Sequence, residues 1–549
     1  MQKKWNVKYD CRGMETNEII DVILEDRGVE DIHALLYPNE DCLIPFEKMK
    51  NIDRAAKIIL DGIENNKKFL VYYDTDADGV SAGTIATRWL KHHGADVVYT
   101  INQGKEHGIA AADAVLLAQA DILWIVDSIE TQMYPYEFAL NMGIEEIVIT
   151  DHHICSKSMQ KQMERTGRIT LISSAVDYPN PALSGSATTW KLCSYCDWLE
   201  LDDYSEDLVD LATMGLVADM VNVGVDSPEN RYICSKGFNN QVNPALKKIN
   251  GTYEYNSQAV SFGIAPLVNA ANRTNENEKA LELFLSDDKK EISRLVADLK
   301  DCKEYQNWEI KDLMPLLEEQ ATAQMDKKVM FFFIEPENEI AGLIGNKLLE
   351  KYQRPVFVLK TRMEFDEETG EITRHEYTGS CRAVGVKNFK EYVDNTGMCG
   401  TGGHELAFGL WLDAEVLEDF RNALEDALQD VEFVQETTVD IQINQEQITD
   451  DFIKKLKLLN RISGTGWPSI SVMVSGITEY EVGSMSGGKH LKLIADNGGL
   501  LYIKWNYNGD REFDGPVSAI GSLDSGYFGR TYYRQLIMND FIIDNEEDL

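Results

Sequence analysis

Acidic residues and histidines directly follow three short apolar runs in the N-terminal part of the sequence. These runs are Phe69–Tyr73, Ile122–Val126 and Ile147–Thr150. The residues that follow them include Asp74, Asp76, Asp78, Asp127, Asp151, His152 and His153. Carboxylate oxygens suit Mg²⁺ and Mn²⁺, and added histidine shifts the preference toward transition metals. The pattern predicts a site for metal-assisted chemistry.

The first cluster, Asp74-Thr-Asp-Ala-Asp-Gly79, has two simpler interpretations. An EF-hand loop would need a glutamate at its twelfth position, which is Ile85 here, and a preceding helix where a strand is predicted. A capped helix start would explain one aspartate, because an aspartate accepts backbone N–H bonds at a helix N-terminus. Three aspartates within five residues repel one another unless a cation holds them.

The segment Asp151-His152-His153 is more specific than Asp127, which alone also fits a structural cap. We expect two adjacent histidines to point to opposite sides, so that one is a metal ligand. Asp151 is placed to fix a histidine tautomer. Further on, Asp219 ends an apolar stretch, and a buried carboxylate needs a partner such as a metal.

The predicted metal ligands suffice for two cations about 4 Å apart, an arrangement that generates a hydroxide and clamps a phosphoryl group. They are Asp74, Asp76, Asp78, Asp127, His152 and Asp219.

A second group of residues suits an anion. Gly402 and Gly403 precede His404, and glycine-rich backbone lets N–H groups approach a phosphate that a histidine can also bind or protonate. Ser380 and Arg382 offer a hydroxyl and a guanidinium for the same ligand. A tight turn explains the glycines about as well, and an exposed arginine is usually only solvated.

Strand and helix patterns alternate from Phe69 to Thr150, which indicates βαβ units and a parallel sheet with its site at the carboxyl ends of the strands. The predicted fold class is α/β, with a second α/β domain and a C-terminal OB-like β-barrel. The predicted regions are a helical leader (1–50), a catalytic domain (51–274), linker helices (275–326), a substrate domain (327–435) and an oligonucleotide-binding (OB) fold (436–549).

Composition narrows the possible functions. The 549 residues carry a net charge of −39, which argues against non-specific binding to polyanions but leaves room for a local basic groove. We find no apolar run long enough to span a membrane and no signal peptide. Nine scattered cysteines indicate reduced thiols in a cytoplasm, and Cys193 and Cys196 are interpreted as buried small residues rather than zinc ligands.

The motifs and their order along the chain resemble the RecJ branch of the DHH phosphoesterases, over nearly the whole length of the sequence. The DHH triad itself is Asp151-His152-His153. The other matching segments are Asp26-Arg27-Gly28, Gly215–Met220, Glu229-Asn-Arg231, Ala265–Arg273, Gly342–Gly345, Gly379–Arg382, Gly402–His404, Ser463–Pro468 and Lys489–Leu493.

The resemblance implies an exonuclease dependent on two Mn²⁺ or Mg²⁺ ions that degrades single-stranded DNA from the 5′ end to mononucleotides, in recombination or repair. It implies that Asp127 bridges the metals and that His153 either supports a metal ligand or polarises the phosphate. Arg273 and His404 would hold substrate phosphates, and Ser380 and Arg382 the 5′ end. A monomer with single-stranded DNA and a single-strand-binding protein or helicase as partners is expected, in a bacterial or phage setting.

The sequence also departs from the family pattern. Gln103 stands where an arginine usually binds the 5′ phosphate, with Lys105 as a substitute, and Asn272 replaces a glycine. Two other functions stay open. One is a phosphodiesterase for short oligoribonucleotides or cyclic dinucleotides, and the other is a non-catalytic replication or repair scaffold.

Overall fold

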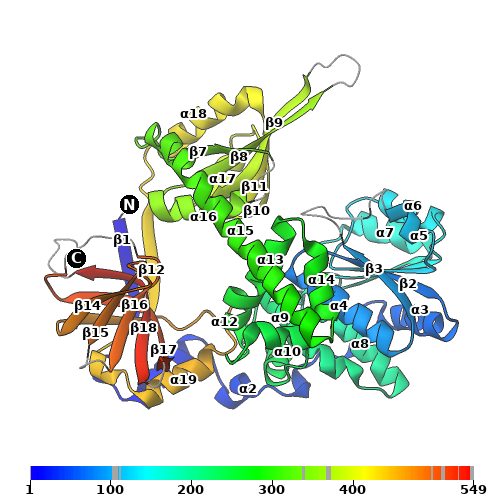
Figure 1. Cartoon of the computed structure of the whole chain (residues 1–549), viewed down its shortest axis with the longest axis horizontal. Coiled ribbons are helices and arrows are strands. Elements are labelled where there is room, and N and C mark those ends of the chain that lie inside the picture. The colour runs from blue at the N-terminus through cyan, green and yellow to red at the C-terminus, as the bar shows by residue number, and fades with distance from the viewer. Residues whose placement is uncertain are drawn as a thin grey trace. The chain divides into compact units, whose positions relative to one another are not determined.

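The structure is a computed structural model that describes residues 2–101, 109, 113–336, 340–365, 372–495, 499–507, 513–528 and 531–543 (Figure 1). The chain forms two compact units. One comprises Met1–Asn6 and Glu304–Thr438, and the other Val7–Lys303 and Val439–Leu549. No helix among the described residues is both long and apolar enough to pass through a membrane.

A five-stranded parallel sheet forms the centre of the predicted catalytic domain. Its order is β3 (Asp96–Ile101), β2 (Lys68–Tyr73), β4 (Ile122–Val126), β5 (Glu146–Asp151) and β6 (Ile169–Ser173). The middle strands are continuous apolar runs because helices cover both faces of such a sheet. The prediction of an α/β fold with a parallel sheet is confirmed.

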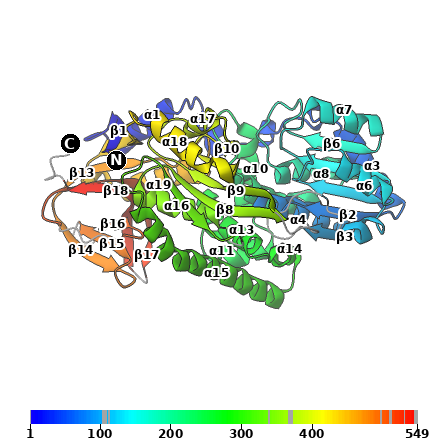
Figure 2. The ribbon, with the colours of Figure 1, turned by 90° about the horizontal axis from the view of Figure 1, so that it is seen from above.

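Alternate residues of β2 belong to two different cores. Phe69, Val71 and Tyr73 pack with α3, α4, α8 and α9, whereas Leu70 and Tyr72 pack with α5, α6 and α7 (Figure 1). The bounds are α3 (Ile52–Glu64), α4 (Ala77–His92), α5 (Ala114–Leu117), α6 (Tyr134–Asn141), α7 (Lys157–Thr166), α8 (Gly185–Glu200) and α9 (Val209–Ala218). Two helix layers therefore hold the sheet between them (Figure 1). The view from above looks onto the sheet, with β6 and β3 at its opposite edges (Figure 2).

Further helices follow this layer. They are α10 (Pro228–Asn239), α11 (Pro244–Asn250), α12 (Ser257–Ala259), α13 (Ala265–Arg273), α14 (Asn277–Leu285) and α15 (Lys289–Thr322). The predicted linker helices correspond to α14 and to α15, which is 34 residues long. Cys193 and Cys196 lie buried and free in α8, as the sequence interpretation held.

The other unit contains a second five-stranded sheet. Its order is β10 (Gly400–His404), β11 (Ala407–Asp413), β9 (Ile372–Arg382), β8 (Val356–Phe365) and β7 (Met330–Ile334). Helix α16 (Ala341–Tyr352) packs on one face, and α17 (Phe389–Asp394) and α18 (Leu417–Ala427) pack on the other. Helix α16 and the edge strand β7 match the predicted second α/β domain.

The C-terminal strands join the N-terminal strand in one sheet. Its order is β1 (Gln2–Asp10), β12 (Val434–Ile443), β13 (Val472–Ile477), β17 (Val517–Phe528), β18 (Thr531–Ile543), β16 (Leu500–Lys504), β15 (His490–Ala495) and β14 (Tyr480–Met485). The strands fit an OB-like architecture, but no pairing of β1 with β14 closes a barrel among the described residues.

The prediction of a helical leader over 1–50 is wrong at its start. Strand β1 occupies Gln2–Asp10, and the helices follow as α1 (Thr16–Asp26) and α2 (Ile32–Leu36). The segment Gln2–Asp10 alternates long polar side chains with Trp5 and Val7. Its hydrogen-bond partner β12 lies more than 400 residues away, so local periodicity could not identify the strand.

A buried ion pair joins α8 to α10. Lys191 Nζ lies 2.7 Å from Glu229 Oε1, with 1% and 2% of their side chains exposed. Lys191 also donates to the Ile44 carbonyl, and Glu229 accepts from the Tyr178 hydroxyl and the Asn180 amide. Burial lowers the pKa of Lys191 despite the attraction of Glu229. Both charged groups have hydrogen-bond partners, so the loss of either side chain would leave the other charge buried and unpaired.

We predict that Lys191→Met lowers the free energy of unfolding in urea by about 3–5 kcal/mol, the usual cost of breaking a buried pair. The matched control is Lys57→Met, which removes an exposed i,i+4 pair with Asp61 and should cost less than about 1 kcal/mol. Equal effects of the two substitutions would contradict the assignment.

Candidate functional site

The predicted metal ligands converge at the carboxyl ends of three neighbouring parallel strands. Asp74 follows β2, Asp127 follows β4, and His152 follows the last residue of β5. Asp219 joins them as the C-cap of α9. We call the following residues the candidate metal centre: Asp74, Asp76, Asp78, Asp127, Asp151, His152, His153 and Asp219.

Asp127 has an unusual backbone conformation and an unsatisfied carboxylate. Its φ is 56°, in the left-handed region that a non-glycine residue adopts only at a cost. Its N–H donates to the Thr150 carbonyl at 2.8 Å, which fixes the turn. The side chain is buried, and Oδ1 makes no hydrogen bond to any described group. A buried carboxylate oxygen without a hydrogen bond fits the role of a cation ligand.

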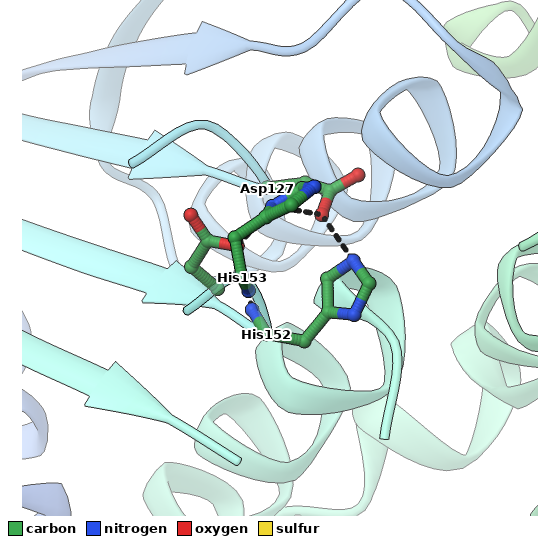
Figure 3. A group of neighbouring side chains, drawn as sticks. Asp127, His152 and His153 are labelled. Atoms are coloured by element: carbon green, nitrogen blue, oxygen red, sulfur yellow. Dashed lines mark hydrogen bonds and ion pairs between the residues drawn. The ribbon is translucent and has the colours of Figure 1, made fainter. Parts of the chain in front are cut away.

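Both histidines face Asp127 (Figure 3). His152 Nε2 lies 3.3 Å and His153 Nδ1 3.9 Å from Asp127 Oδ1. The two ring centroids are 4.5 Å apart. The expectation that adjacent histidines point to opposite sides is therefore wrong, because the chain leaves β5 at this point and strand alternation no longer applies.

Asp151 holds the two histidines in place. Its Oδ1 accepts the backbone N–H groups of His152 and His153 and lies 2.8 Å from His153 Nδ1. This hydrogen bond raises the pKa of His153 to about 9, so the imidazole is cationic at neutral pH. Burial opposes ionisation of Asp151, but the bond to His153 keeps its pKa low. The structure pairs Asp151 with His153, and the tautomer-fixing role of Asp151 stays a prediction.

The first aspartate cluster combines capping with metal-ligand geometry. Asp76 is the N-cap of α4 and accepts from the N–H groups of Asp78 and Gly79. Asp78 accepts from Gly185 N at 2.7 Å and Ser186 N at 3.1 Å, so the N-terminus of α8 holds its carboxylate. The interpretation as a helix cap is thus correct for Asp76, which is also one of the candidate metal ligands.

Gly185 and Gly215 were missed as site residues. A Cβ on Gly185 would collide with the carboxylate of Asp127, and one on Gly215 would collide with Asp78 and Ser186. The serine at position 184, which caps α8, was the available sequence signal. These glycines let two helices approach the carboxylates closely.

The carboxylates raise one another's pKa values. Burial, followed by the charges of Asp74 and Asp78, raises the pKa of Asp76 to about 7. Burial and Asp78 raise the pKa of Asp219 to about 6, and the same two causes raise that of Asp127 well above its ordinary value. Bound cations would reverse this effect.

The ligand atoms form three overlapping groups, each with all atoms within 4.8 Å of one another. These groups are Asp74, Asp76 and Asp127; Asp127, Asp151, His152 and His153; and Asp78, His152 and Asp219. Asp127 and His152 each belong to two groups. The donor types and the orphaned Asp127 oxygen fit divalent cations such as Mn²⁺ and Mg²⁺.

Asn272 supports the first aspartate cluster. It is buried near the end of α13, and its amide donates to the Thr75 carbonyl at 3.1 Å and to the Thr75 hydroxyl at 3.2 Å. Arg273, predicted to bind phosphate, is the next residue and the last of α13. The predictions for Gln103 and Lys105 lie outside the described residues.

The predicted phosphate-binding residues form two rows across the second sheet. In one row Ser380 pairs with Gly409, which pairs with Gly402; in the other Arg382 pairs with Ala407, which pairs with His404. Directly paired residues share a face. The polar side chains therefore flank a floor of glycine and alanine, and His404 is exposed.

Helix α16 touches the same face. Arg382 Nε donates to Asn346 Oδ1 at 3.0 Å, and a Cβ on Gly342 would lie 2.7 Å from the Arg382 guanidinium. A Cβ on Gly345 would lie 3.1 Å from Arg382 Cγ. The two glycines of the Gly342–Gly345 motif therefore let Arg382 lie against the first turn of the helix, whose N–H groups favour an anion.

Comparison with known proteins agrees with this geometry. The N-terminal domain of the DHH family matches residues 68–216, from β2 into α9. YorK of Bacillus subtilis, named as a prophage-derived single-strand DNA-specific exonuclease, is 26% identical over 79% of this chain and 78% of its own length. RecJ of the same species is 26% identical over 89% of this chain and 63% of its own length.

The fold agrees as well. The crystal structure of Thermus thermophilus RecJ in complex with Mn²⁺ covers 98% of this chain and 80% of that chain, with a TM-score of 0.77 and 21% identity. The resemblance to RecJ-type DHH proteins is thus confirmed, and the relatives support a nuclease role. Solved RecJ structures with Mn²⁺ and with Mg²⁺ agree with the donor set of the candidate metal centre.

We predict a pH-dependent stability of the metal-free protein that depends on Asp76. Because the folded state raises this pKa to about 7 from 3.8, the stabilising proton is fully bound below pH 3.8 and lost as pH rises through 7. The measurement is the difference in the free energy of unfolding between the wild type and Asp76→Asn, in a chelator. This difference should fall by a few kcal/mol as the pH rises from 5 to 8. Saturating Mn²⁺ should remove this difference, and Asp21→Asn is the exposed control. A difference in the free energy of unfolding that does not change with pH would contradict the raised pKa of Asp76.

We also predict that Gly185→Ala weakens Mn²⁺ binding at least about tenfold, a scale typical for groups that orient ligands. The added methyl group would push the Asp127 carboxylate from its position. Gly263→Ala is the matched control, since its Cβ meets nothing within 4 Å. Electron paramagnetic resonance of free Mn²⁺ measures both affinities, and equal affinities would refute the close-approach argument.

Proposed function

We propose that this protein is a two-metal-dependent exonuclease that hydrolyses single-stranded DNA from the 5′ end to mononucleotides, in DNA recombination or repair. The proposal rests on one geometric observation: the orphaned carboxylate of Asp127 belongs to two groups of ligand atoms at once. A carboxylate in that position suits a bridge between two cations. The names of the relatives supply the substrate class.

The chemistry that two Mn²⁺ or Mg²⁺ ions supply is the generation of a hydroxide and the stabilisation of charge in an in-line displacement at phosphorus. Asp74, Asp76 and Asp127 would hold one ion, and His152 with Asp78 and Asp219 the other. His153, held by Asp151, would stabilise negative charge on the phosphate.

Each unit is assigned its own phosphate-binding residues. Arg273 follows Asn272, which is bonded to the Asp74–Asp76 loop, so we assign Arg273 to a phosphate of the substrate. In the second sheet Ser380, Arg382 and His404 would bind further phosphates, with Gly402 and Gly403 leaving backbone room. We assign the 5′ end to Ser380 and Arg382.

The polymer preference and the partners belong to the same proposal. The C-terminal sheet fits an OB-like domain, a common single-strand binder. The protein would act as a monomer with a single-strand-binding protein or a helicase. The bacterial and phage sources of the relatives support only the setting, a bacterial or phage-infected cell.

We predict that Asp127→Ala abolishes exonuclease activity, by at least about a thousandfold, while the folded state remains. The assay uses 5′- and 3′-labelled single strands with Mn²⁺, and mononucleotides should appear from the 5′ end. The control is His33→Ala, an exposed residue of α2. Release from 3′ ends alone, or degradation of duplex alone, would refute the proposal.

Dinucleotides and cyclic dinucleotides belong in the same assay. Faster hydrolysis of these than of long single strands would favour the alternative phosphodiesterase. A folded protein that binds no Mn²⁺ would instead favour the non-catalytic scaffold.

A further inference from the structure

A second cluster of metal-ligating side chains lies away from the candidate metal centre. It consists of His92, His93 and Asp202. His92 is the last residue of α4 and His93 its C-cap, whereas Asp202 follows the C-cap of α8. The N-terminal ends of the same two helices hold Asp78 and its donors Gly185 and Ser186. The cluster is therefore at the opposite ends of α4 and α8 from the candidate metal centre.

The spacing of the donor atoms suits a tetrahedral transition metal. Asp202 Oδ2 lies 3.3 Å from His92 Nε2 and 3.7 Å from His93 Nε2. A metal bound at about 2.0–2.1 Å places neighbouring tetrahedral ligands about 3.3 Å apart. Both distances to Asp202 Oδ2 are already close to that separation, and one ligand atom from each residue lies within 4.8 Å of the other two. A fourth position would be left for water.

Neighbouring groups hold these side chains in place. The His92 ring stacks on Tyr204 at 3.8 Å with an interplanar angle of 4°. The His93 ring packs on Trp89 at 4.1 Å. The Asp203 N–H donates to Asp202 Oδ1, which leaves Oδ2 for the histidines. Side chains fixed in this way lose little entropy on binding a metal.

Ordinary hydrogen bonding explains only part of the cluster. His92 Nε2 makes a hydrogen bond with Asp202, as an imidazole and a carboxylate do without a metal. His93 Nε2 is buried and forms only a long contact with Asp197 Oδ1, at 3.3 Å, an oxygen that also accepts from the Trp89 indole N–H. Asp202 Oδ2 lies 3.7 Å from the same ring nitrogen. A ring nitrogen between two carboxylates is well placed to share a cation with them.

Electrostatics also favours a cation here. The C-termini of α4 and α8 both end at the cluster, and each carries partial negative charge. Asp197 and Asp202 add carboxylates. Two imidazoles with one carboxylate suit zinc and its neighbours rather than Mg²⁺, which prefers oxygen ligands. His92 is 41% exposed and Asp202 33%, so a metal can enter from solvent.

We propose that His92, His93 and Asp202 bind one transition-metal dication of the zinc class. The bound metal would tie the end of α4 to the segment between α8 and Tyr204 and so stabilise the helix pair. The proposal is independent of the nuclease activity, because none of its ligands belongs to the candidate metal centre.

The test uses the full chain with Co²⁺ as a spectroscopic probe. Saturating Mg²⁺ is added because it prefers oxygen ligands and leaves a histidine-rich site free. The wild type and Asp127→Asn should each bind one Co²⁺ with visible d–d absorption, displaced by Zn²⁺. His92→Gln and Asp202→Asn should each weaken this binding at least tenfold. The matched control is His33→Gln, another exposed histidine, which should bind as the wild type does.

Wild-type affinity in both His92→Gln and Asp202→Asn would overturn the proposal, as would a Co²⁺ signal that disappears in Asp127→Asn. Circular dichroism verifies that each variant is folded. Thermal unfolding provides a second measurement: Zn²⁺ should raise the unfolding temperature of the wild type in Mg²⁺ but not that of Asp202→Asn. An equal rise in both proteins would also overturn it.

Discussion

The N-terminus of α8 against the carboxylate of Asp78 is the interaction on which the candidate metal centre depends. Several acidic side chains meet at the ends of β2, β4 and β5, and without compensation they would repel one another and take up protons. Two backbone N–H groups of α8 fix and partly neutralise one carboxylate. The absence of a side chain at Gly185 then lets the same helix turn lie against Asp127. The remaining negative charge and the orphaned Asp127 oxygen make the site one for cations.

This arrangement gives α4 and α8 a common polarity. Both helices begin at the candidate metal centre, where their partial positive charge meets aspartates, and both end near His92, His93 and Asp202. Acidic groups at helix starts and histidines at helix ends are each favourable for the helix dipole. The helix pair therefore has a group of candidate metal ligands at each end. Most ligand atoms are carboxylate oxygens at one end and imidazole nitrogens at the other. Buried packing of the two helices on the sheet keeps the ends apart and in register.

The sequence was a good guide wherever the signal was local. Apolar runs followed by acids located β2, β4 and β5, and the apolar pattern of 341–352 located α16. It failed where the partner is remote. Strand β1 pairs with β12 from the other end of the chain, and the two histidines after β5 turn to one side because the strand has ended. The Lys91-His92-His93 segment carried a visible signal for a second cluster, but Asp202, its third member, lies over a hundred residues further on.

By itself, the sequence determined the α/β class, the types of ligand, and the order of motifs that relates this chain to RecJ-type proteins, because apolar periodicity and residue chemistry are local properties. Only the tertiary structure decided which candidate ligands lie within reach of one another. It placed Asp127 in two ligand groups, joined Asp151 to His153, and aligned Ser380 and Arg382 with Gly402 and His404 through the register of β9, β10 and β11. These pairings follow from strand order and helix packing, which bring together residues that no spacing along the chain connects.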